Sequence, residues 1–265
     1  FMSEPIALYP LDRAEFTIEI KAGKHTLRHK LRKPTLSELI ERENDSFYET
    51  EAVSDSEEKV NAEDEAANGR LWNKIAVSVQ GYKLHRDDPT PQDAFVAVSD
   101  QYRAAIPASH KATAVRGLYQ FTTEIETTGD EDGFVLSGDT WTIKQTIGGA
   151  DDPAYIIRHI LNTPTEAQRR EFRRKASDVR FSKGSKRIKT KVVTHLRAHV
   201  ELYDALMQGV EGVTVENGAH FNAMESGSNI KPTIRHDALK GLIDPIWKRS
   251  VIDTLMREFE AGLSD

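Results

Sequence analysis

The sequence repeats itself, and this repeat constrains the fold more than any other feature of the chain. Three blocks occur twice in the same order: Phe16–Ile18 and Trp141–Ile143, Leu27–Thr35 and Ile157–Thr165, and Leu71–Trp72 and Leu202–Tyr203. The longest block reads LRHKLRKPT the first time and IRHILNTPT the second time. A shared order with nearly constant spacing predicts a tandem duplication, in which both copies must satisfy one fold.

The repeat divides the 265 residues into two modest domains. We predict a first copy over residues 2–126, a linker over 127–133 and a second copy over 134–265. A copy of this length buries roughly two thirds of its unfolded surface, so neither copy needs a disulfide or a metal ion to fold. The chain contains no cysteine, which fits a reducing compartment.

Alternating residues predict a β-hairpin at the start of each copy. Phe16, Ile18 and Ile20 alternate with polar residues, and a second alternating stretch follows the turn at Ala22–Gly23. The second copy repeats this pattern from Trp141 to Leu161, with a wider turn.

Helix signals follow each hairpin. The pairs Thr35/Glu38 and Thr165/Gln168 have the spacing of a capping box, in which two side chains satisfy free backbone N–H groups. A second helix is predicted from Ala66 to Val79 in the first copy and from Val192 to Met207 in the second, with Gly81 and Gly212 at their ends. Two more helices are predicted in each copy, and they begin after Thr90–Pro91 and Pro107 in the first and at Ala238 and Asp244–Pro245 in the second. The expected unit is a hairpin followed by helices, and the fold class is α+β, dominated by helices.

The middle segments of the two copies carry opposite charge. Residues 38–65 hold twelve acidic and two basic residues, whereas residues 168–197 hold twelve basic and two acidic residues. They are either solvated loops or complementary surfaces, which would meet within one chain or between chains. The candidate partner-binding residues are Glu49, Glu51, Asp55, Glu57, Glu58, Glu63, Asp64 and Glu65 on the acidic side, and Arg169, Arg170, Arg173, Arg174, Lys183, Lys186, Arg187, Lys189 and Lys191 on the basic side.

The sequence contains none of the common catalytic motifs. It lacks a phosphate-binding loop ending in Gly-Lys-Ser/Thr, a dinucleotide-binding glycine pattern and a nucleophile elbow. His195 and His199 have the spacing of two metal ligands, but the glutamate of a zinc-protease helix is missing and arginine lies between them. The repeated Arg28-His29 and Arg158-His159 pairs favour hydrogen-bonded histidines that face the core or another subunit. We therefore predict a non-enzymatic protein without cofactor or metal.

The passage from Phe16 to Glu43 resembles the start of tail assembly proteins of long-tailed phages, in which a small hairpin ends in a Leu-Arg-x-Pro-Thr segment that leads into an acidic helix. The resemblance covers fewer than thirty residues of each copy and is weaker in the second. It implies a self-associating protein that chaperones or forms part of a phage or prophage tail. It also implies a cytoplasmic location in a bacterium or an infected host, with association to the virion.

Two functions follow from these patterns. The first is an assembly, scaffolding or chaperone-type protein that binds protein partners and itself through the two charged segments. The alternative is a nucleic-acid-binding protein that uses residues 168–197, although only Phe172 and Phe181 are available there for stacking on bases. No apolar run approaches the ~20 residues that span a bilayer, so no membrane partner is expected.

Overall fold

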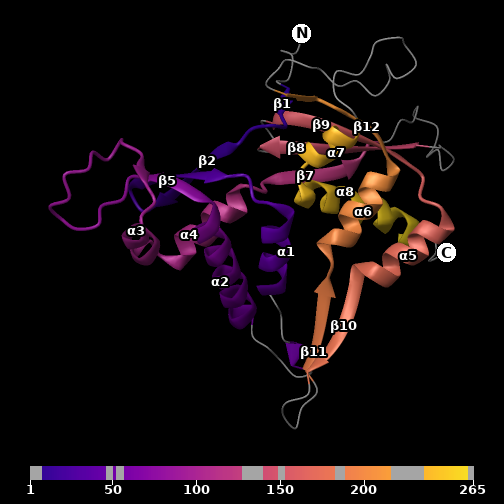
Figure 1. Cartoon of the computed structure of the whole chain (residues 1–265), viewed down its shortest axis with the longest axis horizontal. Coiled ribbons are helices and arrows are strands. Elements are labelled where there is room, and N and C mark those ends of the chain that lie inside the picture. Colours follow the sequence, from indigo (N-terminus) through magenta and orange to yellow (C-terminus); the bar gives the residue numbers. More distant parts are fainter. Residues whose placement is uncertain are drawn as a thin grey trace. The chain divides into compact units, whose positions relative to one another are not determined.

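The computed structural model describes residues 8–45, 50–51, 57–126, 140–148, 153–182, 189–215 and 236–261, and Figure 1 shows the course of the chain. These residues combine helices with mostly antiparallel sheets, in agreement with the predicted mixture of helix and strand. They fall into two compact units. The β2 unit, named after strand β2 (Glu15–Ala22), comprises the described parts of 14–119 and 177–194. The β8 unit, named after strand β8 (Thr140–Gly148), comprises those of 1–13, 120–176 and 195–265.

The β2 unit contains a four-stranded antiparallel sheet in the order β2-β3-β5-β6. After β2, its strands are β3 (His25–Arg32), β5 (Ala76–Gln80) and β6 (Val96–Ala97). Its helices are α1 (Leu36–Asp45), α2 (Glu57–Ile75), α3 (Asp100–Ala105) and α4 (Ala108–Gly117). Helices α1 and α4 pack against α2, and α4 also contacts β2 (Figure 1). Leu31, Leu39 and Trp72 are buried in the core that these elements enclose.

The β8 unit also contains a four-stranded antiparallel sheet, in the order β12-β9-β8-β7. Its further strands are β7 (Phe121–Ile125), β9 (Pro153–Asn162) and β12 (Met207–Glu211), with a parallel two-residue pair of β1 (Tyr9–Pro10) and β13 (Val213–Thr214). Its helices are α5 (Glu166–Ala176), α6 (Leu196–Leu206), α7 (His236–Leu242) and α8 (Pro245–Ala261). Helix α6 packs against α5 and α8, and α8 contacts β7 and β8.

Both predicted hairpins are confirmed, and their registers correspond. Ile18 lies opposite His29 in the β2–β3 pair, and Ile143 lies opposite His159 in the β8–β9 pair. The corresponding residues Leu27 and Ile157 are buried, and so are Leu31 and Leu161, four residues further along each strand. The alternation of the sequence therefore places one face of each hairpin in the core.

Both capping boxes are confirmed as well. The Thr35 backbone N–H donates to Glu38 Oε2 at 2.9 Å, and the Glu38 N–H donates to Thr35 Oγ1 at 3.3 Å. The Thr165 N–H donates to Gln168 Oε1 at 2.8 Å, and the Gln168 N–H donates to Thr165 Oγ1 at 3.2 Å. Each box satisfies donors at the start of the helix that follows the hairpin.

The predicted second helix of each copy is too long at its C-terminal end. Helix α2 ends at Ile75 and α6 ends at Leu206, and strands β5 and β12 follow at once. These strands pair with β3 and β9, where Val79 lies opposite His29 and Val210 lies opposite His159. Spacing by four residues also fits a helix, but the open edge of the hairpin supplies hydrogen-bond partners that turn the last apolar residues into a strand. Gly81 and Gly212 consequently follow strands, with φ of 86° and 78°, rather than helices.

Three other sequence predictions differ from the structure. Val192 belongs to a strand, and the helix begins at Leu196. The helix expected after Thr90–Pro91 begins only at Asp100, where the Ser99 hydroxyl accepts a hydrogen bond from the Tyr102 N–H. Strand β7 was not predicted, because its five residues gain regular structure only by pairing with β8. The helices predicted after Pro107, at Ala238 and from Pro245 are confirmed by α4, α7 and α8.

The compact units do not follow the predicted copy ranges of 2–126 and 134–265. Residues 120–126 group with the β8 unit, since β7 pairs with β8, and residues 177–194 group with the β2 unit. The predicted linker 127–133 lies outside the described residues.

Substitution of Gly212 by alanine is expected to destabilise the β8 unit by at least ~2 kcal/mol. Its φ of +78° is left-handed, and a Cβ atom there would lie 2.0 Å from the Ile156 carbonyl oxygen. Gly241→Ala, in α7, is the matched control, because a Cβ at Gly241 meets no atom within 4 Å. The control should be neutral or slightly stabilising in denaturant titrations. Equal effects of the two substitutions would contradict this reading of Gly212.

Candidate functional site

The acidic and basic segments meet through their backbones. Residues of the basic segment form a hairpin of β10 (Ser177–Ser182) and β11 (Lys189–Thr194), and β4 (Thr50–Glu51) of the acidic segment adds to it antiparallel. The sheet order is β10-β11-β4, with Lys189 opposite Glu51 and Thr190 opposite Thr50. The two segments of opposite charge therefore pair within one chain. Contact within one chain was one of the two arrangements expected from the sequence, and contact between chains was the other.

The predicted partner-binding residues fall into three groups. Glu49, Asp55, Lys183, Lys186 and Arg187 lie outside the described residues. The backbone alone is described for Glu51, Glu57, Glu58, Glu63, Lys189 and Lys191. The side chains are described for Asp64, Glu65, Arg169, Arg170, Arg173 and Arg174.

The α5 arginines are partly neutralised by glutamates of the same helix. Glu166 accepts from Arg169 at 2.8 Å and from Arg170 at 2.9 Å, and Arg174 lies 3.5 Å from Glu171. The hydrogen bond from Arg170 lowers the pKa of Glu166 below its usual value. These pairs lie at the surface and are spaced by three or four residues, so solvent screening leaves them little weight in stability.

The four arginines differ in their surroundings. Arg169 is 23% exposed, and its guanidinium lies 4.9 Å from the centre of the Phe259 ring in α8, a cation–π distance. Arg170 and Arg174 are each 75% exposed. Arg173 is exposed on the same helix and lowers the pKa of Glu166 through its charge. Arg170, Arg173 and Arg174 are therefore the described members of the basic set that face solvent.

On the acidic side, Asp64 is held inside the β2 unit. Its carboxylate accepts from Arg42 of α1 at 2.7 Å and from Arg116 of α4 at 2.8 Å, and it is 18% exposed. Asn68 donates to the same carboxylate at 3.0 Å. Asp64 thus joins three helices, and its charge is already compensated within the unit.

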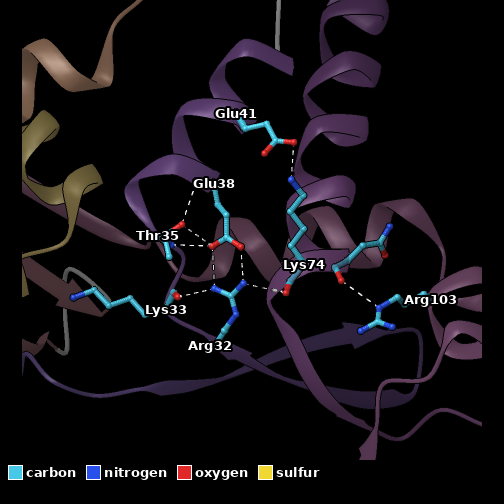
Figure 2. A network of polar contacts seen from close by, with 8 residues as sticks. Arg32, Lys33, Thr35, Glu38, Glu41, Lys74 and Arg103 are labelled. Carbon is cyan, nitrogen blue, oxygen red and sulfur yellow. Dashed lines mark hydrogen bonds and ion pairs between the residues drawn. The ribbon is translucent and has the colours of Figure 1, made fainter.

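A second ionic network joins the hairpin to α1 and α2 (Figure 2). Arg32, at the end of β3, donates to both carboxylate oxygens of Glu38 and also to the Lys74 carbonyl oxygen at 3.2 Å. Lys74 in turn lies 2.6 Å from Glu41. Glu38 therefore serves the capping box and a bidentate ion pair at once, and the Arg32 hydrogen bonds lower its pKa to about 2.

The repeated histidines are buried in both units, which confirms their predicted core role. Trp72 Nε1 donates to His29 Nδ1 at 3.0 Å, and the Tyr203 hydroxyl lies 2.6 Å from His159 Nδ1. Burial lowers the pKa of His29 to about 4 and that of His159 to about 3. Both rings are therefore neutral at pH 7 and act as hydrogen-bond partners, not as acids.

In the β2 unit the hydrogen bonds continue beyond His29. An indole N–H can only donate, so the neutral His29 ring carries its proton on Nε2 and donates to the Tyr82 hydroxyl at 3.0 Å. The Tyr82 hydroxyl also forms a hydrogen bond with His110 Nδ1 at 3.0 Å, and burial raises the pKa of Tyr82. Tyr82 and His110 were not predicted from the sequence, because they lie far from His29 along the chain and outside any repeated block.

Both ring nitrogens of His199 have partners within the chain. His199 is buried, and its Nε2 lies 3.0 Å from Asp253 of α8, while its Nδ1 lies 3.0 Å from the His195 carbonyl oxygen. His195 precedes α6 at the N-cap position. Within the described ranges, no three His, Cys, Asp or Glu side chains are arranged to hold a metal ion.

Comparisons with protein-family models, with curated proteins and with solved structures each found no match to this chain. No described helix has the length and apolar character to cross a membrane.

Replacing Glu38 by glutamine should lower the free energy of unfolding by ~2 kcal/mol at pH 7, after allowance for the partial exposure of Arg32. The folded-state pKa of Glu38 is about 2 against an ordinary 4.5, so its stabilisation is fully present above pH 4.5 and is lost as the pH falls toward 2. Chemical denaturation across this range should show the two proteins converging at the acid end. Asp100→Asn is the control, because the Asp100 side chain is 98% exposed in its pair with Arg103. A pH-independent difference would contradict the assignment.

Proposed function

We propose that this protein is a non-enzymatic assembly or scaffolding protein, which binds protein partners and itself through its acidic and basic segments. The resemblance of residues 16–43 to phage tail assembly proteins supports a role in a phage or prophage tail, in the cytoplasm or associated with the virion. The observation that carries the proposal is the addition of β4 to β11, in which a strand of the acidic segment pairs with a strand of the basic segment.

The same pairing can form between two chains. Strand addition uses backbone hydrogen bonds, and opposite charge selects the partner and raises the encounter rate. If the acidic segment of one chain occupies the basic hairpin of the next, the contact is heterologous and builds rings or filaments. A contact that repeats from one chain to the next is the kind of contact from which an assembly protein can build a larger structure.

A tandem duplication is part of the proposal. In each unit, the second hairpin strand pairs with the strand that follows the second helix, and a glycine with positive φ comes next. The counterparts Trp72 and Tyr203 both bond to the histidine of the second hairpin strand. Corresponding registers, caps and buried polar pairs support an origin from one ancestral module.

Nucleic-acid binding is the second candidate. Its support is the exposed row of Arg170, Arg173 and Arg174 on α5. The glutamates at 166 and 171 pair with two of these arginines, and this reduces the charge that could neutralise phosphates.

Self-association should weaken with salt. At ~50 mM salt, light scattering should give masses above the 29.8 kDa monomer, and these should fall at ~500 mM as the charges are screened. Arg173→Glu with Arg174→Glu should reduce the mass at low salt. The control variant Lys24→Glu with Arg86→Glu makes the same change in net charge at exposed residues outside both segments and should retain it. A protein that shows no salt dependence would remove this mode of self-association.

Fluorescence anisotropy with duplex and single-stranded oligonucleotides separates the two candidates. We expect no binding that depends on Arg173 and Arg174 at ~200 mM salt. Affinity that falls steeply between ~50 and ~200 mM salt and is lost in the Arg173→Glu, Arg174→Glu variant would instead favour the nucleic-acid role.

A further inference from the structure

The outer edge of β2 pairs with no other strand in the part of the chain that the structure describes. The Lys33 N–H donates to the Ala14 carbonyl oxygen at 3.0 Å, which makes these residues a hydrogen-bonded pair at the end of the β2–β3 ladder. Because pairs alternate along an antiparallel ladder, the backbone N–H and C=O groups of Thr17, Glu19 and Lys21 point away from β3. Among the described strands, β3 alone pairs with β2.

The corresponding edge of the β8 unit is occupied. Strand β8 holds the same place in its hairpin as β2, and β7 pairs with it antiparallel. Backbone hydrogen bonds at both ends of this pair, from Glu126 to the Thr142 oxygen at 2.9 Å and from Gly148 to the Gln120 oxygen at 3.5 Å, fix its register. At the centre, Glu124 lies opposite Lys144.

Strand β7 also carries nearly the sequence of β2. Residues 121–125 read FTTEI, and residues 16–20 read FTIEI, so that four of five residues are the same. A strand with the sequence of β2 therefore covers the β8 edge, whereas the edge of β2 itself has no such cover among the described residues.

The β7–β8 register can be transferred to β2. When the sequence of β7 is aligned with that of β2, Glu124 falls on Glu19. When β8 is aligned with β2 through the repeat, in which Trp141 matches Phe16, Lys144 also falls on Glu19. The transferred register thus places Glu19 opposite Glu19 of another chain and Thr17 opposite Lys21. It is symmetric about Glu19, and it uses the three residues whose backbone groups point outward.

We infer that β2 pairs antiparallel with β2 of a second copy of this chain, about a two-fold axis at Glu19. The contact joins two four-stranded sheets into one of eight strands, and it closes on itself because the same edge is used twice. This inference goes beyond the proposed function, since it uses a surface outside both charged segments and does not depend on them.

Charge on the outer face moderates this pairing. Two Glu19 carboxylates face each other across the axis, and like charges directly opposite are unfavourable. Each carboxylate has its own counter-ion, because Arg28 of β3 lies 3.1 Å from Glu19. Arg28 therefore reduces the repulsion between the two Glu19 carboxylates in the dimer. A charged residue on an edge strand also limits pairing of that edge with strands of other proteins.

Disulfide trapping tests the register directly, because the chain has no cysteine of its own. Glu19→Cys should give a covalent dimer on mild oxidation, since directly opposed residues lie within disulfide reach. Thr17→Cys is the matched control: its counterpart in the second copy is Lys21, so the two introduced thiols lie ~13 Å apart and should not cross-link. Absence of cross-linking in both variants, or equal cross-linking in both, would overturn the inference, including the case in which another protein covers this edge.

A second experiment uses sedimentation at ~500 mM salt, where association through the charged segments is screened. We expect twice the 29.8 kDa monomer mass. Glu19→Gln should tighten the dimer about twofold to fivefold by removing the repulsion. Glu19→Thr keeps the outward backbone N–H and should retain the dimer. Glu19→Pro removes this N–H and should give monomers.

The two association modes can fail independently. Proline at an outward-facing edge position leaves the β2–β3 ladder intact, and circular dichroism checks the fold. Arg173→Glu with Arg174→Glu should leave the cross-linking of Glu19→Cys unchanged. A Glu19→Pro variant that folds and remains dimeric at high salt would refute the β2 contact without touching the proposed role of the charged segments.

Discussion

The structure of each unit depends on a buried hydrogen bond between a hairpin histidine and an aromatic residue of the following long helix. Trp72 bonds to His29 in the β2 unit, and Tyr203 bonds to His159 in the β8 unit. A buried imidazole without a partner would cost roughly 1–3 kcal/mol, so this bond holds the helix in one position along the strand. The position of the helix sets where it ends, and so where the strand that follows it, β5 or β12, joins the sheet.

Several charged side chains in the described part of the chain are paired with residues of neighbouring elements. Asp64 binds two arginines from neighbouring helices, and Glu38 binds Arg32 while capping its own helix. Within the described part of the acidic segment, the charges of Glu38 and Asp64 are therefore already paired inside the β2 unit. The two segments meet in one chain through a short backbone ladder between β4 and β11.

The two units differ at the outer edges of their hairpins. Strand β7 covers one hairpin edge, whereas no described strand covers the other, although β7 and β2 have almost the same sequence. Proteins rarely leave a long sheet edge exposed, because its unpaired backbone groups can form hydrogen bonds with strands of other chains. Symmetric pairing of β2 with itself would satisfy this edge and, together with the charged segments, would give the chain two separate contacts for assembly.

Local residue patterns were sufficient to predict the hairpins, both capping boxes and the buried histidines, because alternation and capping depend on residues close in sequence. Position in the fold decided the rest. The apolar residues after Ile75 and Leu206 have helical spacing, yet they form strands because a hairpin edge lies beside them. Strand β4 pairs only with β11 among the described strands, far along the chain, and the β4–β11 pair within the candidate site could not be predicted for that reason. Sequence alone therefore determined which segments repeat and which carry charge, whereas long-range backbone pairing determined which of them meet.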